Sequence, residues 1–141
     1  FLSCQILGSA IAKAGRGSII NIGSIYGILS PDQRLYEYRR DLGEVFFKPI
    51  AYSASKSGIY GLSRYLSTYW AKNKVRVNTL TLGGVFNNQD QQFLEEYYKK
   101  VPLGRMASSD EYGGAIVFLL SEASSYMTGS NLVMDGGLSA W

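Results

Sequence analysis

Tyr52 and Lys56 are the two residues whose types and spacing most directly suggest chemistry. They stand four positions apart, so on a helix they project from the same face. A free phenol has a pKa of about 10 and exchanges protons poorly at neutral pH. A fixed ammonium group about 4 Å away favours phenolate by about 4 kcal/mol at an effective dielectric constant near 20. The pair can therefore form a proton-transfer group, although an isolated Y-x-x-x-K also fits an ordinary amphipathic helix.

The composition excludes several other kinds of catalytic site. None of the 141 residues is histidine, so a Ser-His-Asp triad, a Cys-His pair and an H-E-x-x-H zinc site are impossible. The only cysteine, Cys4, argues against a disulfide framework and fits a reducing compartment, so we expect a cytoplasmic protein. No metal site is expected from one cysteine and scattered carboxylates. Any acid–base catalyst must then be Tyr, Lys, Asp or Glu.

Charge and hydropathy give little support for nucleic acid or membrane partners. The net charge is only +3, and the basic residues are spread along the chain. No apolar run approaches 18 residues, and no signal peptide is visible. The length suits one domain covering residues 1–141. Because Phe1 already lies inside a helical pattern with no cap before it, we expect this chain to be the C-terminal piece of a longer protein.

Helical and strand patterns alternate along the sequence. Four segments have helical periodicity or a helix start: residues 1–14, 51–71, 89–100 and 108–120, the last opened by the capping box Ser108-Ser-Asp-Glu111. Apolar side chains share one face of the first helix (Leu2, Ile6, Ala10) and of the second (Ile59, Leu62, Leu66, Tyr69). Three short apolar runs predict strands: 18–22, 75–80 and 131–135. The alternation predicts an α/β fold with a parallel sheet.

Several polar features follow the predicted strands. Ser24 comes after the first strand, Tyr52 and Lys56 open the next helix, and the loop 82–87 follows the second strand. In open α/β sheets, ligands bind beyond the carboxyl ends of the strands. A hydroxyl, a phenol and an ammonium group beside a glycine loop suit the polarisation of a carbonyl or alcohol oxygen, while a hydride carrier acts on the carbon.

Five stretches, in this order, resemble the short-chain dehydrogenase/reductase family and cover nearly the whole chain outside residues 31–49. They are Gly17-Ser-Ile-Ile-Asn-Ile-Gly-Ser24, Tyr52-Ser-Ala-Ser-Lys56, Val75-Arg-Val-Asn78, Leu82-Gly-Gly-Val85 and Thr128-Gly-Ser-Asn-Leu-Val-Met-Asp-Gly-Gly137. The resemblance implies the C-terminal part of a Rossmann-type, doubly wound parallel sheet. It also implies NAD or NADP as the cofactor.

The resemblance implies a role for each matching residue. Tyr52 would exchange a proton with the substrate oxygen. Lys56 would hold the nicotinamide ribose hydroxyls and favour the ionised form of Tyr52. Ser24 would hydrogen-bond the substrate carbonyl and its developing negative charge.

The loop after the second strand would complete the nicotinamide site. The backbone around Gly83 and Val85 would face the nicotinamide, together with Tyr52 and Lys56. Asn87 stands where the family often has a threonine that contacts the carboxamide. Leu82 replaces the usual proline, which fixes the backbone φ angle, so this loop is expected to be looser.

The chain also departs from the family pattern. The dinucleotide fingerprint T-G-x-x-x-G-x-G and the N-N-A-G element are absent. The half of the site for adenine and pyrophosphate is therefore missing, and we expect no useful dehydrogenase activity from these 141 residues alone. Residues 31–49 form a charged, tyrosine-rich insert beside the expected site, which could grip a sugar or sugar nucleotide. The alternative is a solvated insertion without a ligand role.

Three functions remain open at this point. The first is an NAD(P)-dependent oxidoreductase acting on an alcohol or ketone, including a sugar. Within the family, the chain resembles bacterial members associated with surface-polysaccharide and flagellin-glycan modification, on the combination of Ser24-Ile-Tyr-Gly27, the insert, Tyr69-Trp-Ala71, Pro102-Leu-Gly-Arg-Met106 and Trp141. The second is a catalytically silent truncated module or pseudoenzyme. The third is a nucleotide-sugar epimerase or dehydratase, although the C-terminal motifs look like the simple, single-domain branch. Family members pair through the helices that here begin at Phe1 and Ala51, so a homodimer or homotetramer is expected.

Overall fold

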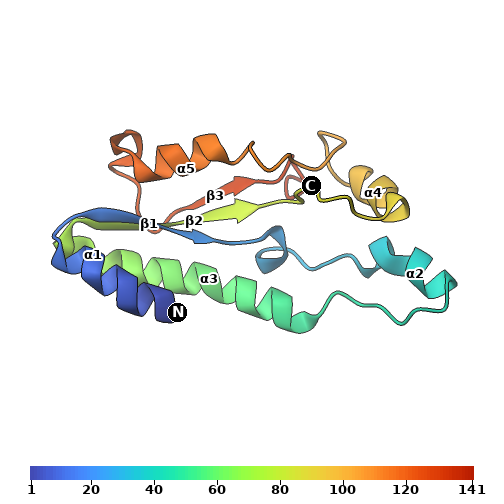
Figure 1. Ribbon diagram of the computed structural model, residues 1–141, viewed down its shortest axis with the longest axis horizontal. Coiled ribbons are helices and arrows are strands. Elements are labelled where there is room, and N and C mark those ends of the chain that lie inside the picture. Colours follow the sequence, from blue (N-terminus) through green and yellow to red (C-terminus); the bar gives the residue numbers. More distant parts are fainter.

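Three parallel strands form the sheet in the computed structural model, which describes all residues from Phe1 to Trp141. The strands are β1 (Gly17–Ile22), β2 (Val75–Leu82) and β3 (Asn131–Met134), in the order β1-β2-β3 (Figure 1). Gly17 of β1 lies opposite Val75 of β2, and Thr79 of β2 lies opposite Asn131 of β3. The predicted α/β class and parallel sheet are confirmed.

Helices cover both faces of this sheet (Figure 1). One face carries a π-helical turn (Cys4–Gly8), α1 (Ser9–Lys13) and α3 (Ile50–Tyr69), and the other carries α5 (Gly113–Leu120). Two further helices, α2 (Glu37–Asp41) and α4 (Gln91–Tyr98), lie toward the carboxyl ends of the strands. Short 3-10 turns occur at Ile25–Gly27, Gln33–Tyr36, Ala71–Asn73 and Glu122–Ser124. No helix combines the length and the apolar character needed to cross a membrane.

One predicted helix start differs from the structure. The capping box was expected to open a helix at Ser108, but α5 begins only at Gly113. The Glu111 carboxylate accepts a hydrogen bond from the Ser108 N–H, as a capping box requires. The Ser108 hydroxyl, however, donates to the same carboxylate, at 3.2 Å, instead of accepting from a backbone N–H. Residues 109–112 therefore form turns before the helix begins.

Two separate hydrophobic clusters hold the chain together. The first lies between the opening helix, α3 and β2, and consists of Ala12, Leu66, Trp70, Val75 and Val77. The second lies under the insert and α4, and consists of Leu35, Tyr36, Leu94, Tyr97, Val101 and Met106. Because the second cluster includes insert residues, the insert packs on the domain instead of extending into solvent.

The apolar stripe of the opening helix faces away from the first cluster. Leu2 and Ile6 are 67% and 68% exposed, whereas Ala12 is buried. A Cβ atom on Gly8 would lie only 2.2 Å from the Trp70 ring, so a glycine is needed for this close approach. Gly8 and Ala12 thus make the closest inward contacts, with Ile11 packed beside them, while Leu2 and Ile6 are left outside.

Candidate active site

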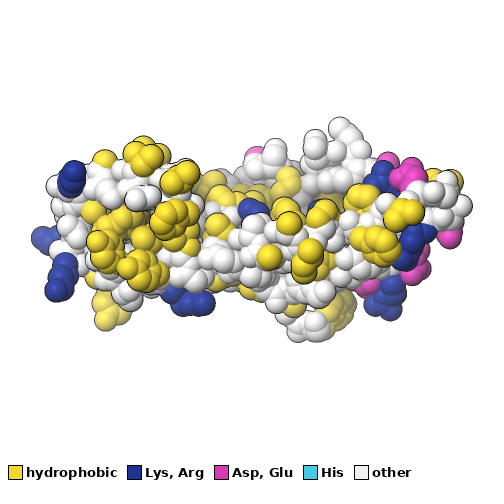
Figure 2. All heavy atoms as spheres, turned by 90° about the horizontal axis from the view of Figure 1, so that it is seen from below, with side chains coloured by type: hydrophobic (Ala, Val, Ile, Leu, Met, Phe, Trp, Pro, Cys, Tyr) yellow, Lys and Arg dark blue, Asp and Glu magenta, His cyan; other side chains and the backbone are white.

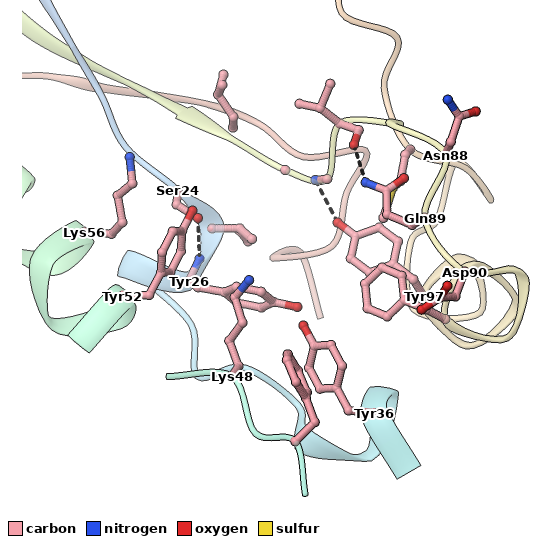
Figure 3. A pocket seen from close by; sticks show the side chains of 18 of the residues that line it. Ser24, Tyr26, Tyr36, Lys48, Tyr52, Lys56, Asn88, Gln89, Asp90 and Tyr97 are labelled. Carbon is pink, nitrogen blue, oxygen red and sulfur yellow. Dashed lines mark hydrogen bonds between the residues drawn. The ribbon is translucent and has the colours of Figure 1, made fainter. Parts of the chain in front are cut away.

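A pocket of about 590 Å³ lies at the carboxyl ends of β1 and β2 (Figure 3). Its wall is assembled from the residues after β1, the start of α3, the loop after β2, the insert and the segment that leads into α4. Five residues expected in the site line it: Ser24, Tyr52, Lys56, Gly83 and Val85. This is the position at which parallel α/β sheets bind ligands.

Ser24 is fixed by contacts with α3 and with its own turn. Its side chain is buried, and its Oγ accepts a hydrogen bond from the Tyr26 N–H at 3.2 Å. Its carbonyl oxygen accepts a hydrogen bond from the Tyr60 hydroxyl of α3 at 2.9 Å. Because the Oγ contact is an accepting one, the hydroxyl proton of Ser24 stays free to donate into the pocket.

Tyr52 and Lys56 lie in the first two turns of α3, as their spacing predicts. The Tyr52 side chain remains accessible from the pocket, and Figure 3 shows its ring directed toward Ser24. The Lys56 ammonium lies 6.0 Å from the centre of that ring. It donates one hydrogen bond to the Ile22 carbonyl at 3.1 Å, at the end of β1. Two of its three N–H donors stay available.

Backbone and side-chain contacts from two directions hold the glycine loop after β2. The Gly84 N–H donates to the Tyr97 hydroxyl at 2.8 Å. The Ala107 N–H donates to the Gly84 carbonyl at 2.9 Å, and Val85 forms an isolated bridge with Ala107. A Cβ on Gly83 would lie 2.6 Å from the Cα of Asp135, so only glycine fits there. The leucine at position 82 therefore does not leave the loop unsupported.

Asn87 is the one expected site residue that does not line the pocket. It is exposed, and its backbone N–H donates to the Gln89 side chain at 2.8 Å. The amide of Gln89 in turn donates to the Val85 carbonyl at 2.8 Å. The next two residues, Asn88 and Gln89, take the pocket positions instead.

The insert supplies pocket residues that the sequence motifs do not identify. These are Tyr36, Tyr38, Arg39, Phe46 and Lys48. The Tyr38 hydroxyl donates to the Asp90 carboxylate at 2.6 Å, which ties the insert to the start of α4. A long, charged, aromatic segment between two motifs was the only sequence signal for these positions.

Three of the phenols in the pocket wall are held in their neutral form. Burial raises the pKa of Tyr26, and the nearby Tyr36 and Tyr97 raise it further. Burial also raises the pKa of Tyr36 and the pKa of Tyr97. These phenols therefore serve as hydrogen-bonding and packing groups at neutral pH and not as bases.

Comparison with known proteins identifies relatives over almost the whole chain. Residues 42–139 match the family model described as enoyl-(acyl carrier protein) reductase. The chain is 37% identical over 138 residues to 3-oxoacyl-[acyl-carrier-protein] reductase of Rattus norvegicus, covering 97% of this chain and 51% of the relative. It is 37% identical over 125 residues to post-translational flagellin modification protein A of Campylobacter coli, covering 89% and 47%. The chain thus spans about half the length of the curated relatives that it matches.

Solved structures are similar over almost the entire chain. A short-chain dehydrogenase from Leptospira borgpetersenii with bound NAD+ superposes with a TM-score of 0.88 at 37% identity, covering 99% of this chain and 51% of that one. A gluconate 5-dehydrogenase from Burkholderia cenocepacia, in complex with NADP and tartrate, has a TM-score of 0.83 at 27% identity, covering 98% and 51%. The α/β fold with its parallel sheet is that of part of a Rossmann-type domain. The chain belongs to the short-chain dehydrogenase/reductase family.

Proposed function

We propose that this chain carries the catalytic part of an NAD(P)-dependent oxidoreductase, which transfers hydride between nicotinamide and an alcohol or ketone. One observation carries the proposal: Ser24, Tyr52 and Lys56 come from two elements and line one pocket at the carboxyl ends of parallel strands. The relatives solved with NAD+ and with NADP support the same cofactors here.

The donors along one side of the pocket fit the nicotinamide half of such a cofactor. Lys56 has two unused N–H donors for ribose hydroxyls, because only one is engaged by the Ile22 carbonyl. The backbone of Gly83 and Val85 forms the neighbouring wall. Nicotinamide, when bound, supplies or accepts the hydride. The residues of this chain hold the reacting oxygen and move its proton.

The Tyr52 and Ser24 hydroxyls have different roles at the substrate oxygen. During reduction, the Tyr52 hydroxyl gives its proton to the carbonyl oxygen, and during oxidation it takes the proton from the alcohol. The Ser24 hydroxyl donates a hydrogen bond to the same oxygen and stabilises its negative charge. Lys56 lies one helical turn away, with its ammonium group 6.0 Å from the centre of the Tyr52 ring.

We further propose that the substrate is a polyhydroxylated compound such as a sugar derivative, with a role in surface glycan modification. The flagellin modification protein and the gluconate 5-dehydrogenase among the relatives support this choice. The 3-oxoacyl-[acyl-carrier-protein] reductases among the relatives instead favour an acyl thioester, which is therefore included in the test. The pocket wall also supports it, since the insert contributes Tyr38, Arg39 and Lys48. Cys4 is free, which fits a cytoplasmic reaction. We propose a homodimer or homotetramer as the assembly.

The test is turnover by the full polypeptide in which this sequence occurs, with NADH or NADPH and with gluconate, glucitol or an acetoacetyl thioester. Tyr52→Phe should lower kcat by about 10²- to 10⁴-fold without changing the affinity for reduced cofactor. Tyr65→Phe, a conservative change on the exposed side of the same helix, is the control and should keep full turnover.

Each alternative function has its own result in this experiment. Binding of neither NADH nor NADPH would favour a silent module. Unchanged turnover by Tyr52→Phe would reject the assigned proton donor. Product formation without stoichiometric change of free cofactor would indicate an epimerase or dehydratase.

A further inference from the structure

Lys48 is a second ammonium group beside the proposed catalytic tyrosine. Its Nζ lies 4.8 Å from the centre of the Tyr52 ring and 5.8 Å from the centre of the Tyr26 ring. Figure 3 shows it reaching from the insert into the space between these two tyrosines. It is thus closer to the Tyr52 ring than Lys56, at 6.0 Å, is.

The backbone of Lys48 is held in place by Gln33, at the other end of the insert. The Lys48 N–H donates to the Gln33 side-chain oxygen at 3.0 Å, and its carbonyl accepts from the Gln33 side-chain nitrogen at 3.5 Å. Pro49 follows and restricts Lys48 to extended backbone conformations. The position from which the ammonium group enters the pocket is therefore set by the fold.

The ammonium group of Lys48 has no counter-charge in the structure. Four charged residues line the pocket: Arg39, Lys48, Lys56 and Asp90. Arg39 pairs with Glu44 at 3.0 Å, Lys56 donates to a backbone carbonyl, and Asp90 accepts from Tyr38. Lys48 has only the faces of two aromatic rings, which attract a cation without neutralising it. A half-buried cation of this kind favours an anionic ligand group.

We infer that Lys48 binds a carboxylate or phosphate group of the substrate, so that the substrate is an anionic alcohol or ketone. This inference rests on the proposed function, because it places the reacting oxygen at Tyr52. Since Lys48 lies against the Tyr52 ring, the anionic group belongs to a carbon within a few bonds of the reacting carbon. Hydroxy or keto sugar acids and sugar phosphates have this arrangement.

The experiment measures binding of three probes to the full polypeptide in the presence of oxidised cofactor, by calorimetry. The probes are D-gluconate, D-glucitol 6-phosphate and neutral D-glucitol. We expect at least one anionic probe to bind about tenfold more tightly than glucitol, the advantage of one charged hydrogen bond. Lys48→Gln should remove this advantage, lowering the affinity for the preferred anionic probe much more than the affinity for glucitol. Lys48→Arg should restore it, and Lys72→Gln, an exposed lysine outside the pocket, should keep it.

The two anionic probes identify the group that Lys48 recognises. Tighter binding of gluconate indicates a carboxylate, and tighter binding of glucitol 6-phosphate indicates a phosphate. Equal affinities for all three probes, or an advantage that persists in Lys48→Gln, would overturn the inference. Failure of both anions to bind would also overturn it. The proposed function fails separately, through Tyr52→Phe turnover or absent cofactor binding.

Discussion

A buried chain of hydroxyl groups sets the position of Ser24 in the pocket. The Tyr60 hydroxyl donates to the Ser24 carbonyl and lies 2.8 Å from the Thr81 hydroxyl, which donates to the Asn131 side chain at 2.6 Å. Two hydroxyl protons thus serve three short contacts. At any moment, one of the three contacts therefore has no proton between its two oxygens, and the three contacts share the two protons. The Ser24 backbone is therefore positioned by contacts from α3, β2 and β3 together.

Tyr60→Phe removes the shared hydroxyl while keeping the ring. We expect the free energy of unfolding to fall by about 1–2 kcal/mol, because the buried Ser24 carbonyl loses its donor. Urea unfolding followed by circular dichroism measures this change. Turnover by the full polypeptide should also fall, since the Ser24 backbone is no longer anchored.

Tyr65→Phe is the matched control for Tyr60→Phe. Tyr65 lies on the same helix, its ring is 64% exposed, and it stacks on Tyr69, a contact that phenylalanine retains. Its effect on unfolding should stay within about 0.5 kcal/mol, as is usual for surface changes. Equal effects of the two substitutions would show that the buried network does not stabilise the fold.

An added side chain would have opposite effects at two glycines of this chain, because one has free space around it and the other does not. Gly58 lies inside α3, where an added Cβ would meet nothing within 4 Å, whereas a Cβ on Gly83 would lie 2.6 Å from the Asp135 backbone. Gly58→Ala should raise the free energy of unfolding by about 0.5–1 kcal/mol, because alanine loses less backbone entropy in a helix. Gly83→Ala should lower it by about 1–3 kcal/mol through overpacking. Urea unfolding of both variants checks the signs, and a shared sign would contradict the packing around Gly83.

The turn before α5 carries a contact that depends on pH. The Arg105 guanidinium and the Ser108 N–H hydrogen-bond the Glu111 carboxylate and hold the pKa of Glu111 at about 2, below its ordinary value of 4.5. A depressed folded-state pKa means that the contact stabilises the fold above pH 4.5 and is lost as the pH falls toward 2. Glu111→Gln should therefore destabilise the protein at neutral pH, with a difference from wild type that shrinks below pH 4.5.

Urea unfolding at several pH values measures this difference. Asp41→Asn is the control, because Asp41 makes no ion pair in the structure and its removal should cost little at any of these pH values. A difference between Glu111→Gln and wild type that stays constant down to low pH would contradict the contact.

The sequence predicted the strands and the motif-bearing helix well, since each depends on a local pattern. The apolar runs became β1, β2 and β3, and the tyrosine–lysine spacing placed both side chains at one pocket. The position of Lys48 could not be predicted, because its contacts with Gln33 and Tyr52 depend on how the insert folds back. Likewise, the sequence could not show that Asn88 and Gln89 line the pocket in place of Asn87, because this depends on the hydrogen bonds of the Gln89 side chain.

Across the molecule as a whole, apolar side chains form two buried clusters and also gather on exposed faces, one of which carries the opening helix. The exposed face lies on the opening helix and α3 and includes Leu2, Ile6, Leu7, Tyr65 and Tyr69. Figure 2, which views the molecule from this side, shows apolar side chains gathered over these helices, away from the charged insert. Isolated apolar residues are ordinary on a surface, but a contiguous patch of large side chains is typical of an interface.

A second copy of this chain is the partner we expect on that face, because two antiparallel helix pairs would bury both patches at once. Ile6→Glu places a charge among the apolar side chains and should shift the protein toward monomer. Size-exclusion chromatography with light scattering, at several protein concentrations, measures the mass directly. Gln92→Glu adds the same charge on the exposed surface of α4 and should leave the assembly unchanged. A wild-type protein that remains monomeric at high concentration would contradict this assembly. A dimer that persists in Ile6→Glu would show that the interface lies on another face.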